Sequence, residues 1–255
     1  MQVLPAPILR RFIRHYLFLD CPEAWGSPLC FFPDGHPAVV FSMESPLYQD
    51  QAKMHPFPRT FAYGAITTPR YIYAGERLTL AIAVFHPHGL SAFFNIPASD
   101  LVDQFAPWPE VKGNPFDVNT LNAYFISRMR GNVNSLVEQA VDFIANNKGT
   151  NSVAQLMRHT GLSQRQIERQ FHETIGLGPK RLGNIVRVSA FLKNLKQAPN
   201  DTLTSLALDS GFFDQAHLIR EFKKTTGITP LHYKRDARPL ALNLIRLSGS
   251  YNFPA

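Results

Sequence analysis

The sequence of 255 residues contains only two cysteines, Cys21 and Cys30, and no long hydrophobic run. Two thiols nine residues apart can neither cross-link a protein of this size nor complete a four-ligand zinc site by themselves, so we interpret them as free thiols. No apolar stretch approaches the roughly 18 residues that a membrane span needs. We therefore expect no membrane partner and a cytoplasmic location.

The signatures of enzymes are also missing. The sequence has no Ser/His/Asp pattern, no phosphate-binding P-loop and no paired carboxylates. A DNA-repair alkyl-transfer protein would need a cysteine-rich zinc cluster and a nucleophilic cysteine, which two cysteines do not supply. We therefore predict that the protein is not an enzyme and has neither catalytic residues nor a cofactor.

Acidic residues are scarce in the second half of the chain. Residues 1–130 hold ten Lys and Arg and ten Asp and Glu, whereas residues 131–255 hold sixteen and nine, which accounts for the net charge of +7. A surplus confined to one half is typical of a protein that binds nucleic acid or an acidic surface. On charge alone, a basic domain without such a partner stays an alternative.

Proline separates the same two halves. Fifteen of the twenty prolines precede residue 116, and the short runs between them are rich in β-branched and aromatic residues. Such runs are typical of strands, and many short strands favour a sandwich or a barrel. The expected strands are 12–19, 38–43, 59–66, 70–75 and 78–85. Short helices are expected at 89–95 and 97–105.

From about residue 118 the apolar residues recur at steps of three and four, which predicts helices over 118–130 and 132–147. The fold class is therefore α+β, with a mainly-β domain, barrel or sandwich-like, followed by an all-α domain. The predicted segments are a β-rich domain (1–120), a linker or connecting helix (121–132), a helical domain (133–236) and a C-terminal tail (237–255).

The helical domain contains one pattern twice. Before the turn the offset between the copies is 50 residues, as in Gly161 and Gly211, and after it the offset is 51. The pairs at an offset of 51 are Phe171 and Phe222, Gly176 and Gly227, and Pro179 and Pro230. One residue has thus been gained in the turn of the second copy.

Each repeated residue has a physical reason. Gly161 and Gly211 stand where a tight helix-to-helix turn needs a positive φ. Ser163 and Asp214 are good N-cap types for the helices that follow. Gly176 and Gly227 are expected to end those helices as C-cap glycines, each with a proline three residues later. The pattern predicts two helix-turn-helix units.

The exposed face of the second helix in each unit is polar. Arginine and glutamine can read base edges in a major groove by paired hydrogen bonds, and glutamate can accept a hydrogen bond from cytosine. A single polar face is usually just solvated, but two such faces on matching units in the basic half favour DNA reading. On the second helix of the first unit this face carries Arg165, Gln166, Glu168, Arg169 and His172, and in the second unit it carries Gln215, Ala216, His217 and Arg220.

Residues 179–197 predict one helix between the units. A helix of about 15 to 17 residues spans roughly 22–26 Å, so it could set two recognition helices about one DNA turn, ~34 Å, apart. The phosphate-contacting candidates are Lys180, Arg181, Lys193, Lys196, Lys223, Lys224, Lys234 and Arg235.

Residues 133–236 resemble the DNA-binding domain of AraC/XylS-type transcription regulators. The resemblance rests on "LALDSGFFDQAHLIREFKKTTGITPLHY", residues 206–233. The first unit departs from the family pattern at Met157, where a small alanine is usual, and at His172, where lysine is common. The resemblance implies seven helices. It also implies that the base-contacting candidates are Arg165, Glu168 and Arg169 in the first unit and Gln215, His217 and Arg220 in the second. It also leads us to expect that the first unit supplies more of the base discrimination peculiar to this protein.

The N-terminal half resembles the β-rich, sensor-like domain of one poorly characterised branch of these regulators. The matching stretches are "FFPDGHPAVVF", "YGAITTP" and "VFHPHGLSAFFNIPASDLVD". The resemblance implies a cytoplasmic, sequence-specific transcription regulator that reads two adjacent major-groove segments of double-stranded DNA and is modulated through residues 1–120. RNA polymerase, an unknown small-molecule effector and a second copy of the chain stay open as further partners.

Two alternatives concern the N-terminal half. In the first, it serves only dimerisation or the binding of a partner protein. In the second, His86 and His88 belong to a cupin-like metal site, but residues 89–97 contain no carboxylate to complete it. We therefore predict no metal and expect the two histidines to cap a strand end beside Gly89.

Overall fold

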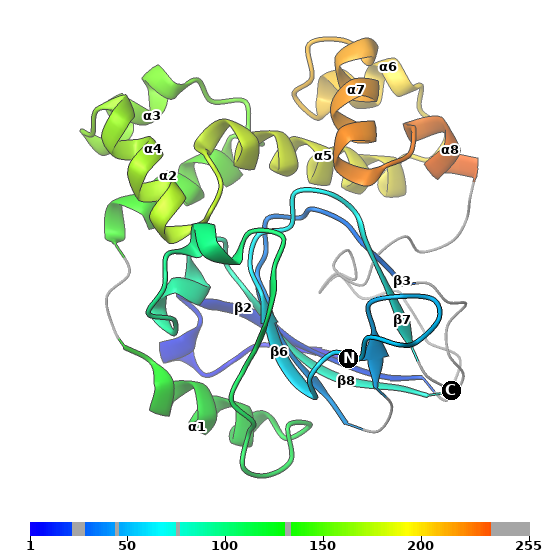
Figure 1. The fold of residues 1–255 in the computed structure, drawn as a ribbon. Helices are drawn as coiled ribbons and strands as arrows, with labels where there is room; N and C mark the ends of the chain where they lie inside the picture. The colour runs from blue at the N-terminus through cyan, green and yellow to red at the C-terminus, as the bar shows by residue number, and fades with distance from the viewer. Residues whose placement is uncertain (22–28, 44–45, 75–76, 131–133, 236–255) are drawn as a thin grey trace.

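The computed structural model describes residues 1–21, 29–43, 46–74, 77–130 and 134–235. The predicted tail, 237–255, lies outside the described residues. The chain forms a β-rich half and a helical half, and a long helix, α5, crosses the upper edge of the strands (Figure 1). None of the described helices is long and apolar enough to span a membrane.

The described strands form two sheets. The larger has six strands in the order β1-β2-β8-β4-β6-β9 and is not closed; the smaller has three, in the order β3-β7-β5. The larger sheet contains β1 (Gln2–Val3), β2 (Ile13–Cys21), β4 (Ala38–Ser42), β6 (Thr60–Tyr63), β8 (Leu78–Phe85) and β9 (Phe105–Pro107). The smaller contains β3 (Leu29–Phe31), β5 (Leu47–Tyr48) and β7 (Arg70–Ala74). The predicted fold class is confirmed, and the architecture is open and sandwich-like rather than a barrel.

Strand β8 shows how the sequence makes two cores. Successive side chains of a strand point to opposite faces. Leu80 and Ile82 therefore enter the cluster between the two sheets, whereas Ala81 and Phe85 enter a second cluster on the other face. Both faces of β8 are buried, so its sequence is continuously apolar instead of alternating with polar residues.

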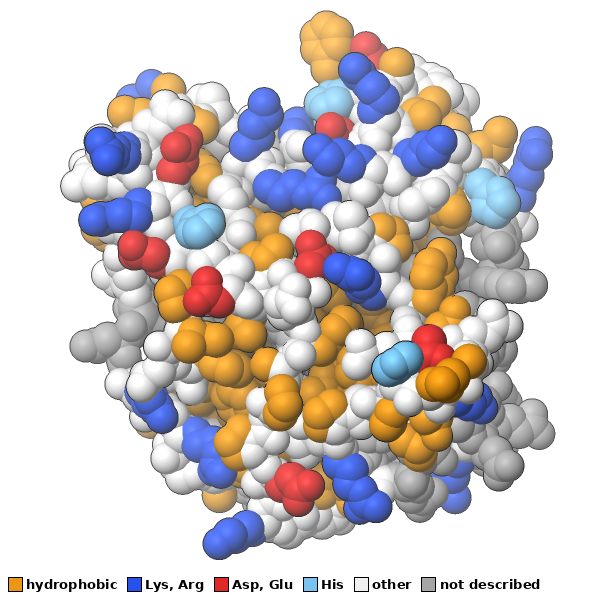
Figure 2. All heavy atoms as spheres, viewed as in Figure 1, with side chains coloured by type: hydrophobic (Ala, Val, Ile, Leu, Met, Phe, Trp, Pro, Cys, Tyr) orange, Lys and Arg blue, Asp and Glu red, His pale blue; other side chains and the backbone are white. Residues whose placement is uncertain are grey.

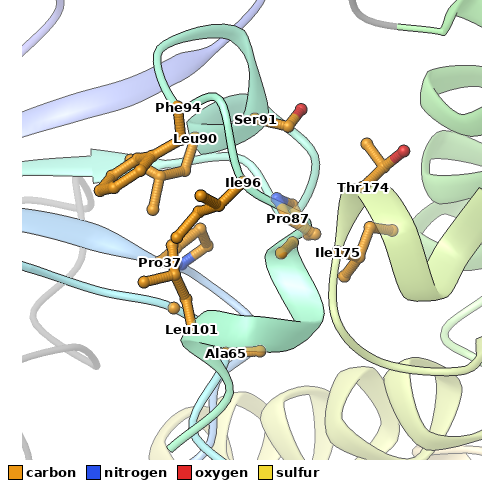
Figure 3. A pocket seen from close by; sticks show the side chains of 12 residues that line it. Pro37, Ala65, Pro87, Leu90, Ser91, Phe94, Ile96, Leu101, Thr174 and Ile175 are labelled. Carbon is orange, nitrogen blue, oxygen red and sulfur yellow. The ribbon is translucent and has the colours of Figure 1, made fainter. Parts of the chain in front are cut away.

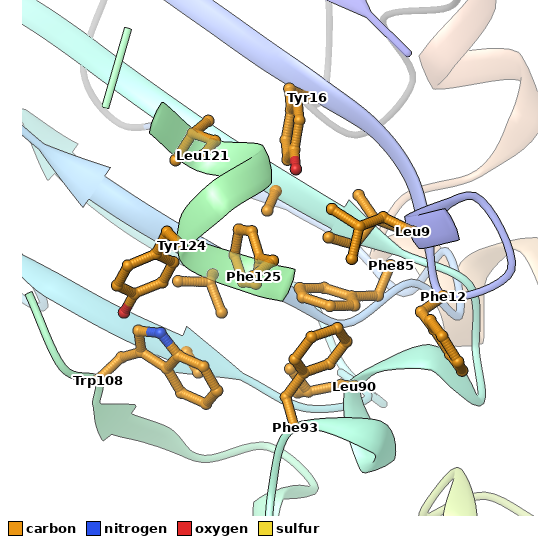
Figure 4. Close-up of a cluster of buried hydrophobic side chains, with 14 of the residues drawn as sticks. Leu9, Phe12, Tyr16, Phe85, Leu90, Phe93, Trp108, Leu121, Tyr124 and Phe125 are labelled. Carbon is orange, nitrogen blue, oxygen red and sulfur yellow. The ribbon is translucent and has the colours of Figure 1, made fainter. Parts of the chain in front are cut away.

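The second cluster, which contains Ala81 and Phe85, is rich in aromatic rings (Figure 4). Phe125 lies at its centre, with its ring centroid 5.6 Å from those of Phe85 and Phe93 in edge-to-face contacts. Phe125 comes from α1 (Val118–Arg128), which Asp117 caps by accepting the N–H groups of Asn119 and Thr120. Burying a phenylalanine side chain stabilises a fold by roughly 1.5–3 kcal/mol. Helix α1 thus packs on the β-rich half, while the predicted boundaries near residue 120 stay a prediction.

The segments predicted as helices at 89–95 and 97–105 are shorter than expected. They form the 3₁₀ turns η2 (Gly89–Ala92) and η3 (Ala98–Leu101). A third, η1 (Pro7–Leu9), precedes β2. In η3 the C-cap residue Val102 is already extended, so the helical pattern cannot continue to residue 105.

Within the described residues, the helical half has seven helices, as the family resemblance implied. They are α2 (Ser135–Asn146), α3 (Val153–Thr160), α4 (Gln164–Thr174), α5 (Pro179–Gln197), α6 (Leu203–Asp209), α7 (Gln215–Thr226) and α8 (Pro230–Arg235). The turn glycines Gly161 and Gly211 have φ of 71° and 81°, as predicted.

Helix α5 supplies the core of both units. Its first half contributes Leu182 and Ile185 to the cluster around α2, α3 and α4. Its second half contributes apolar side chains, among them Phe191 and Leu195, to the cluster around α6 and α7. With 19 residues it is roughly 28 Å long. Both helix-turn-helix units therefore pack against the same helix, α5.

The helical half docks on the β-rich half through close contacts. Ala65 joins the cluster of the first unit and Phe32 that of the second. The end of α4 packs on the segment around η3, where Ile175 faces Pro37, Pro87 and Leu101 (Figure 3). The space left in this seam is about 10 Å³, which is room for no more than one water molecule.

Gly176, directly after α4, carries a testable prediction. It has φ of 80°, and a Cβ here would lie 2.5 Å from Val102 Cγ2 and 2.8 Å from the carbonyl oxygen of Ala98. Gly161 has a similar φ of 71°, but nothing lies within 4 Å of its would-be Cβ. We expect Gly161→Ala to lower the free energy of unfolding by roughly 1–2 kcal/mol through backbone strain alone. Gly176→Ala should cost about 1–3 kcal/mol more, because it also forces the seam apart.

Urea-induced unfolding of both variants and the parent chain checks this expectation. Equal losses for Gly161→Ala and Gly176→Ala would show that the seam is not closely packed.

Candidate nucleic-acid interface

The first unit positions α4 through two capping boxes. Ser152 and Gln155 cap the start of α3, and Ser163 and Gln166 cap the start of α4, each pair exchanging side-chain and backbone hydrogen bonds. Ile167 and Phe171 are buried on the inner face of α4. When the backbone N–H groups at the start of a helix are hydrogen-bonded by nearby side chains, the first turn is held rigid. In helix-turn-helix proteins in general, this turn of the second helix enters the major groove of DNA.

The outer face of α4 presents the three predicted candidates to solvent. Arg165, Glu168 and Arg169 are all exposed. Glu168 accepts a hydrogen bond of 2.8 Å from Gln164 Nε2 on the preceding turn. Nothing in the described part of the chain hydrogen-bonds or ion-pairs with the side chains of Arg165 and Arg169. Two guanidinium groups therefore project from one helix face with their donors unused.

The second unit presents a more constrained face. Gln215 Oε1 accepts a hydrogen bond of 2.9 Å from Thr204 Oγ1, which leaves its amide N–H₂ group to donate outward. The N–H of Phe213 points at Nδ1 of His217 at 3.5 Å, so the proton of the neutral ring lies on Nε2. Arg220 is exposed one turn further on.

A polar network fixes α7 to α5. Asn184 Nδ2 donates to Glu221 Oε2 at 2.7 Å, and Arg187 donates to Asn184 Oδ1. The guanidinium of Arg187 also lies over the ring of Phe212, 5.6 Å from its centroid. The sequence analysis missed all of these residues, because only the fold brings residues 184 and 221 together.

The predicted phosphate candidates fall into three groups. Lys180, Lys223, Lys224 and Arg235 are exposed on the helical half, and so is Lys234, whose Nζ lies 3.4 Å from the carbonyl oxygen of Asp201. Lys193 and Lys196 line a cleft toward the β-rich half. Arg181 points inward, because its Nη2 donates to the carbonyl oxygen of Thr67 at 2.6 Å. The structure therefore gives Arg181 a role in holding the two halves together.

The sequence analysis also missed Phe213. Its side chain is 85% exposed, and it directly precedes Asp214, the N-cap of α7. Leu162 and Phe212 occupy matching positions in the two turns, as do Ser163 and Asp214, so Phe213 is the residue gained in the second copy. The shift in offset located this insertion, but it did not show that the inserted ring faces solvent.

One face of the molecule shows the resulting charge pattern. Lys and Arg side chains gather over the helical half, above α4, α5 and α7, whereas hydrophobic side chains predominate over the strands below (Figure 2). This agrees with the surplus of basic residues counted in residues 131–255.

Two histidines at the end of β8, His86 and His88, lie close together. His86 and His88 stack with their ring centroids 5.9 Å apart, and His88 Nε2 hydrogen-bonds the carbonyl oxygen of Arg11 at 3.1 Å. His88 is also the N-cap residue of η2, beside Gly89. Among the described residues, no three His, Cys, Asp or Glu side chains are placed to share a metal ion.

Comparison with known proteins matches the two halves of the chain to two different family models. Residues 156–236 match the family model described as a helix-turn-helix domain, and residues 1–107 match one described as a domain of unknown function (DUF6597). An uncharacterized HTH-type transcriptional regulator of Staphylococcus aureus is 28% identical over 102 residues. That match covers 40% of this chain but only 13% of the relative's length.

Two solved structures are also similar to this chain. ToxT from Vibrio cholerae matches 86% of this chain and 96% of its own with a TM-score of 0.50 and 11% identity, which shows a shared fold only. A probable AraC family transcriptional regulator from Rhodopseudomonas palustris is 27% identical; the match covers 42% of this chain and all of that one, with a TM-score of 0.37.

Burial keeps several of the histidines neutral. Desolvation is the main cause that lowers the pKa of His15 to about 4, with a smaller contribution from the charge of Arg14. Desolvation, followed by the neighbouring His88, lowers the pKa of His86 to about 4. The same cause holds the pKa of His36 well below its usual value.

This arrangement predicts a loss of stability in mild acid. Between pH 6.5 and about 4 the unfolded chain binds protons at these histidines and the folded chain does not. The free energy of unfolding should therefore be highest above pH 6.5 and fall as the pH drops through that window. Each unit of difference between the pKa values of a histidine in the folded and the unfolded chain corresponds to about 1.4 kcal/mol in the free energy of unfolding. His15→Gln should flatten this dependence, since it removes one of the contributing groups.

Urea unfolding between pH 7 and 4.5 measures the slope, and His55→Gln, at an exposed histidine, is the matched control. If His15→Gln and His55→Gln both keep the parent slope, His15 is not held neutral by burial.

Proposed function

We propose that this chain, whose residues 156–236 form a helix-turn-helix domain of the AraC type, is a cytoplasmic, sequence-specific DNA-binding transcription regulator. It reads two adjacent major-groove segments of double-stranded DNA, one with α4 and one with α7. The β-rich half modulates this binding.

One observation carries the proposal. Helices α4 and α7 each begin at a capped first turn, pack against the same helix, α5, and present a polar outer face. They lie in the half of the chain that carries the whole net charge. On α4 the proposed base-contacting side chains are Arg165, Glu168 and Arg169. On α7 they are Gln215, His217 and Arg220. Arginine suits guanine and glutamine suits adenine, because each can form two parallel hydrogen bonds to one base edge.

Non-specific attraction comes from lysines and an arginine around these helices. Lys180, Lys223, Lys224 and Arg235 are exposed and suited to phosphate contacts, whereas Arg181 is left out because it binds the carbonyl oxygen of Thr67. Each phosphate contact releases counterions, so binding should weaken steeply as the salt concentration rises.

The two units are proposed to differ in role. The guanidinium groups on α4 have no partner in the described residues, whereas Gln215 and His217 on α7 are already hydrogen-bonded within their own unit. Unused guanidinium donors can form two hydrogen bonds to one base edge, whereas part of the hydrogen-bonding capacity of Gln215 and His217 is already used within their unit. This supports the expectation that the first unit supplies the discrimination peculiar to this protein.

A second function of the N-terminal half is also proposed as an alternative. It would serve only dimerisation or a partner protein, which could be RNA polymerase. Sizing of the full chain by light scattering, with and without DNA, separates this alternative from a sensor that acts within one chain.

The binding of DNA can be tested with Arg220. We would first select bound sequences from a random duplex pool with the full chain; two separated sequence blocks are expected. On the selected site, Arg220→Ala should weaken binding by ~1–3 kcal/mol and relax the preference at one base pair. Lys224→Gln, at a nearby exposed cation, is the control; it should weaken all sequences equally and reduce the salt slope by about one.

Fluorescence anisotropy at several salt concentrations gives both quantities. A complete lack of salt-sensitive DNA binding would contradict the proposed function. A uniform loss with Arg220→Ala would instead make Arg220 a phosphate contact.

Phe213 gives a second test of the same surface. An exposed ring beside the start of a recognition helix can pack against a thymine methyl group or a deoxyribose. We expect Phe213→Ser to weaken binding to the selected site several-fold without changing the salt slope. Ile126→Ser removes an exposed apolar side chain from α1, far from α7 in sequence, and should leave DNA binding unchanged. Equal affinities for Phe213→Ser and the parent chain would exclude Phe213 from the interface.

A further inference from the structure

A cleft of about 540 Å³ lies between the two halves of the molecule. One wall comes from the β-rich half, where β2 begins, β8 ends and the segment before β4 passes. The other wall comes from α2, the residues just after it, and α5. The volume lies within the range of about 300–1,000 Å³ in which proteins bind small molecules.

Many of the lining residues are polar or charged, and cations stand on both walls. Arg14 stands on the β-rich wall, and the helical wall carries Lys148, Lys193 and Lys196. The acidic lining residues are Asp34 on the first wall and Asp142 on the second, so positive charge exceeds negative. The histidines of this wall add no charge at neutral pH. A ligand with negative charge at both ends matches this distribution best.

The β-rich wall is a constructed site rather than an open surface. His36 Nδ1 donates to the carbonyl oxygen of Phe85 at 2.8 Å, so its Nε2 accepts from Arg14 Nη1, also at 2.8 Å. The guanidinium of Arg14 is thereby oriented by the half-buried imidazole of His36. Arginine suits carboxylate and phosphate groups, because its planar donors match two oxygen atoms at once.

From these observations we propose that the cleft binds a small, polar molecule with at least two carboxylate or phosphate groups. One group pairs with Arg14 and the other with the lysines of the helical wall. A hydrocarbon acid has a single charged group and would cover the cations of the other wall without pairing them, so we expect it to bind more weakly than a ligand charged at both ends.

The ligand would connect the β-rich half to α5, the helix that carries both units. This consequence rests on the proposed function. Binding would favour one placement of the helical half on the strands, and it would change DNA affinity by the ratio of its affinities for the two placements. The binding event itself does not depend on DNA.

The experiment uses the full chain and calorimetric titration with defined probes. Citrate and fructose 1,6-bisphosphate represent the two sources of multiple negative charge, carboxylate and phosphate groups. Inorganic phosphate, glucose and palmitoleate represent a small single anion, a neutral polar molecule and a hydrocarbon acid. We expect saturable binding of citrate or fructose 1,6-bisphosphate, with at least tenfold weaker binding of the other three.

Two variants locate the site. Arg14→Gln and Lys193→Gln, one on each wall, should each weaken the tighter probe at least tenfold, whereas Lys112→Gln, an exposed lysine outside the cleft, should not. Melting of each variant without probe shows whether it is folded, and Lys193 is exposed, so its replacement should be tolerated. Unchanged probe affinity in a folded Lys193→Gln, or tighter binding of palmitoleate than of citrate, would overturn the proposal.

DNA binding of the probe-free chain is measured alongside. If DNA is bound while no polyanionic probe binds, the cleft proposal fails and the proposed function stands. If the probes bind as expected but no DNA is bound, the proposed function fails and the ligand site stands.

Discussion

The burial of α5 is the constraint on which the rest of the structure depends. Most surface helices have one apolar stripe, but α5 is buried against different partners along its length. Leu182 and Ile185 complete the core of the first unit, and Phe191 and Leu195 complete that of the second. Without α5, neither unit could bury the apolar faces of its own helices. The spacing of the two recognition helices is therefore a property of the shared core and not of a flexible linker.

The same helix connects the reading surface to the β-rich half. The clusters around α5 include Ala65 and Phe32, which come from that half, and Arg181 near the start of α5 donates to Thr67. Close packing at the seam beside α4 contrasts with the open cleft beside α2 and α5. One part of the contact between the halves is thus rigid and the other is hollow, and a hollow contact is where a small molecule can act.

Local chemistry could be predicted from the sequence, because it depends on neighbours in the chain. The caps at Ser163 and Asp214 and the positive φ of Gly161 and Gly211 follow from residue type and spacing, and the structure confirms them. The main strands follow from their β-branched composition and proline boundaries. The predicted helices at 89–95 and 97–105 were too long, because a proline, a glycine and a few helical residues are also compatible with a single 3₁₀ turn.

Contacts between distant residues could not be predicted in this way. Arg181 looked like a phosphate contact because nothing in its neighbourhood shows that Thr67 lies opposite. The pairing of Arg14 with His36, and of Asn184 with Glu221, likewise depends on the complete fold. Helical periodicity alone separates an outer from an inner face, so the outer faces of α4 and α7, on which the six proposed base contacts lie, could be predicted from the sequence.

The added residue in the second turn has an evolutionary consequence. Phe213 was accommodated without loss of the N-cap at Asp214 or of the left-handed glycine at Gly211. Phe213 lies outside both hydrophobic cores, although Phe212 beside it is buried in the second, so a residue can be added at this point while the scaffold is preserved. New recognition chemistry can therefore arise there by insertion, in steps that selection on stability would not oppose.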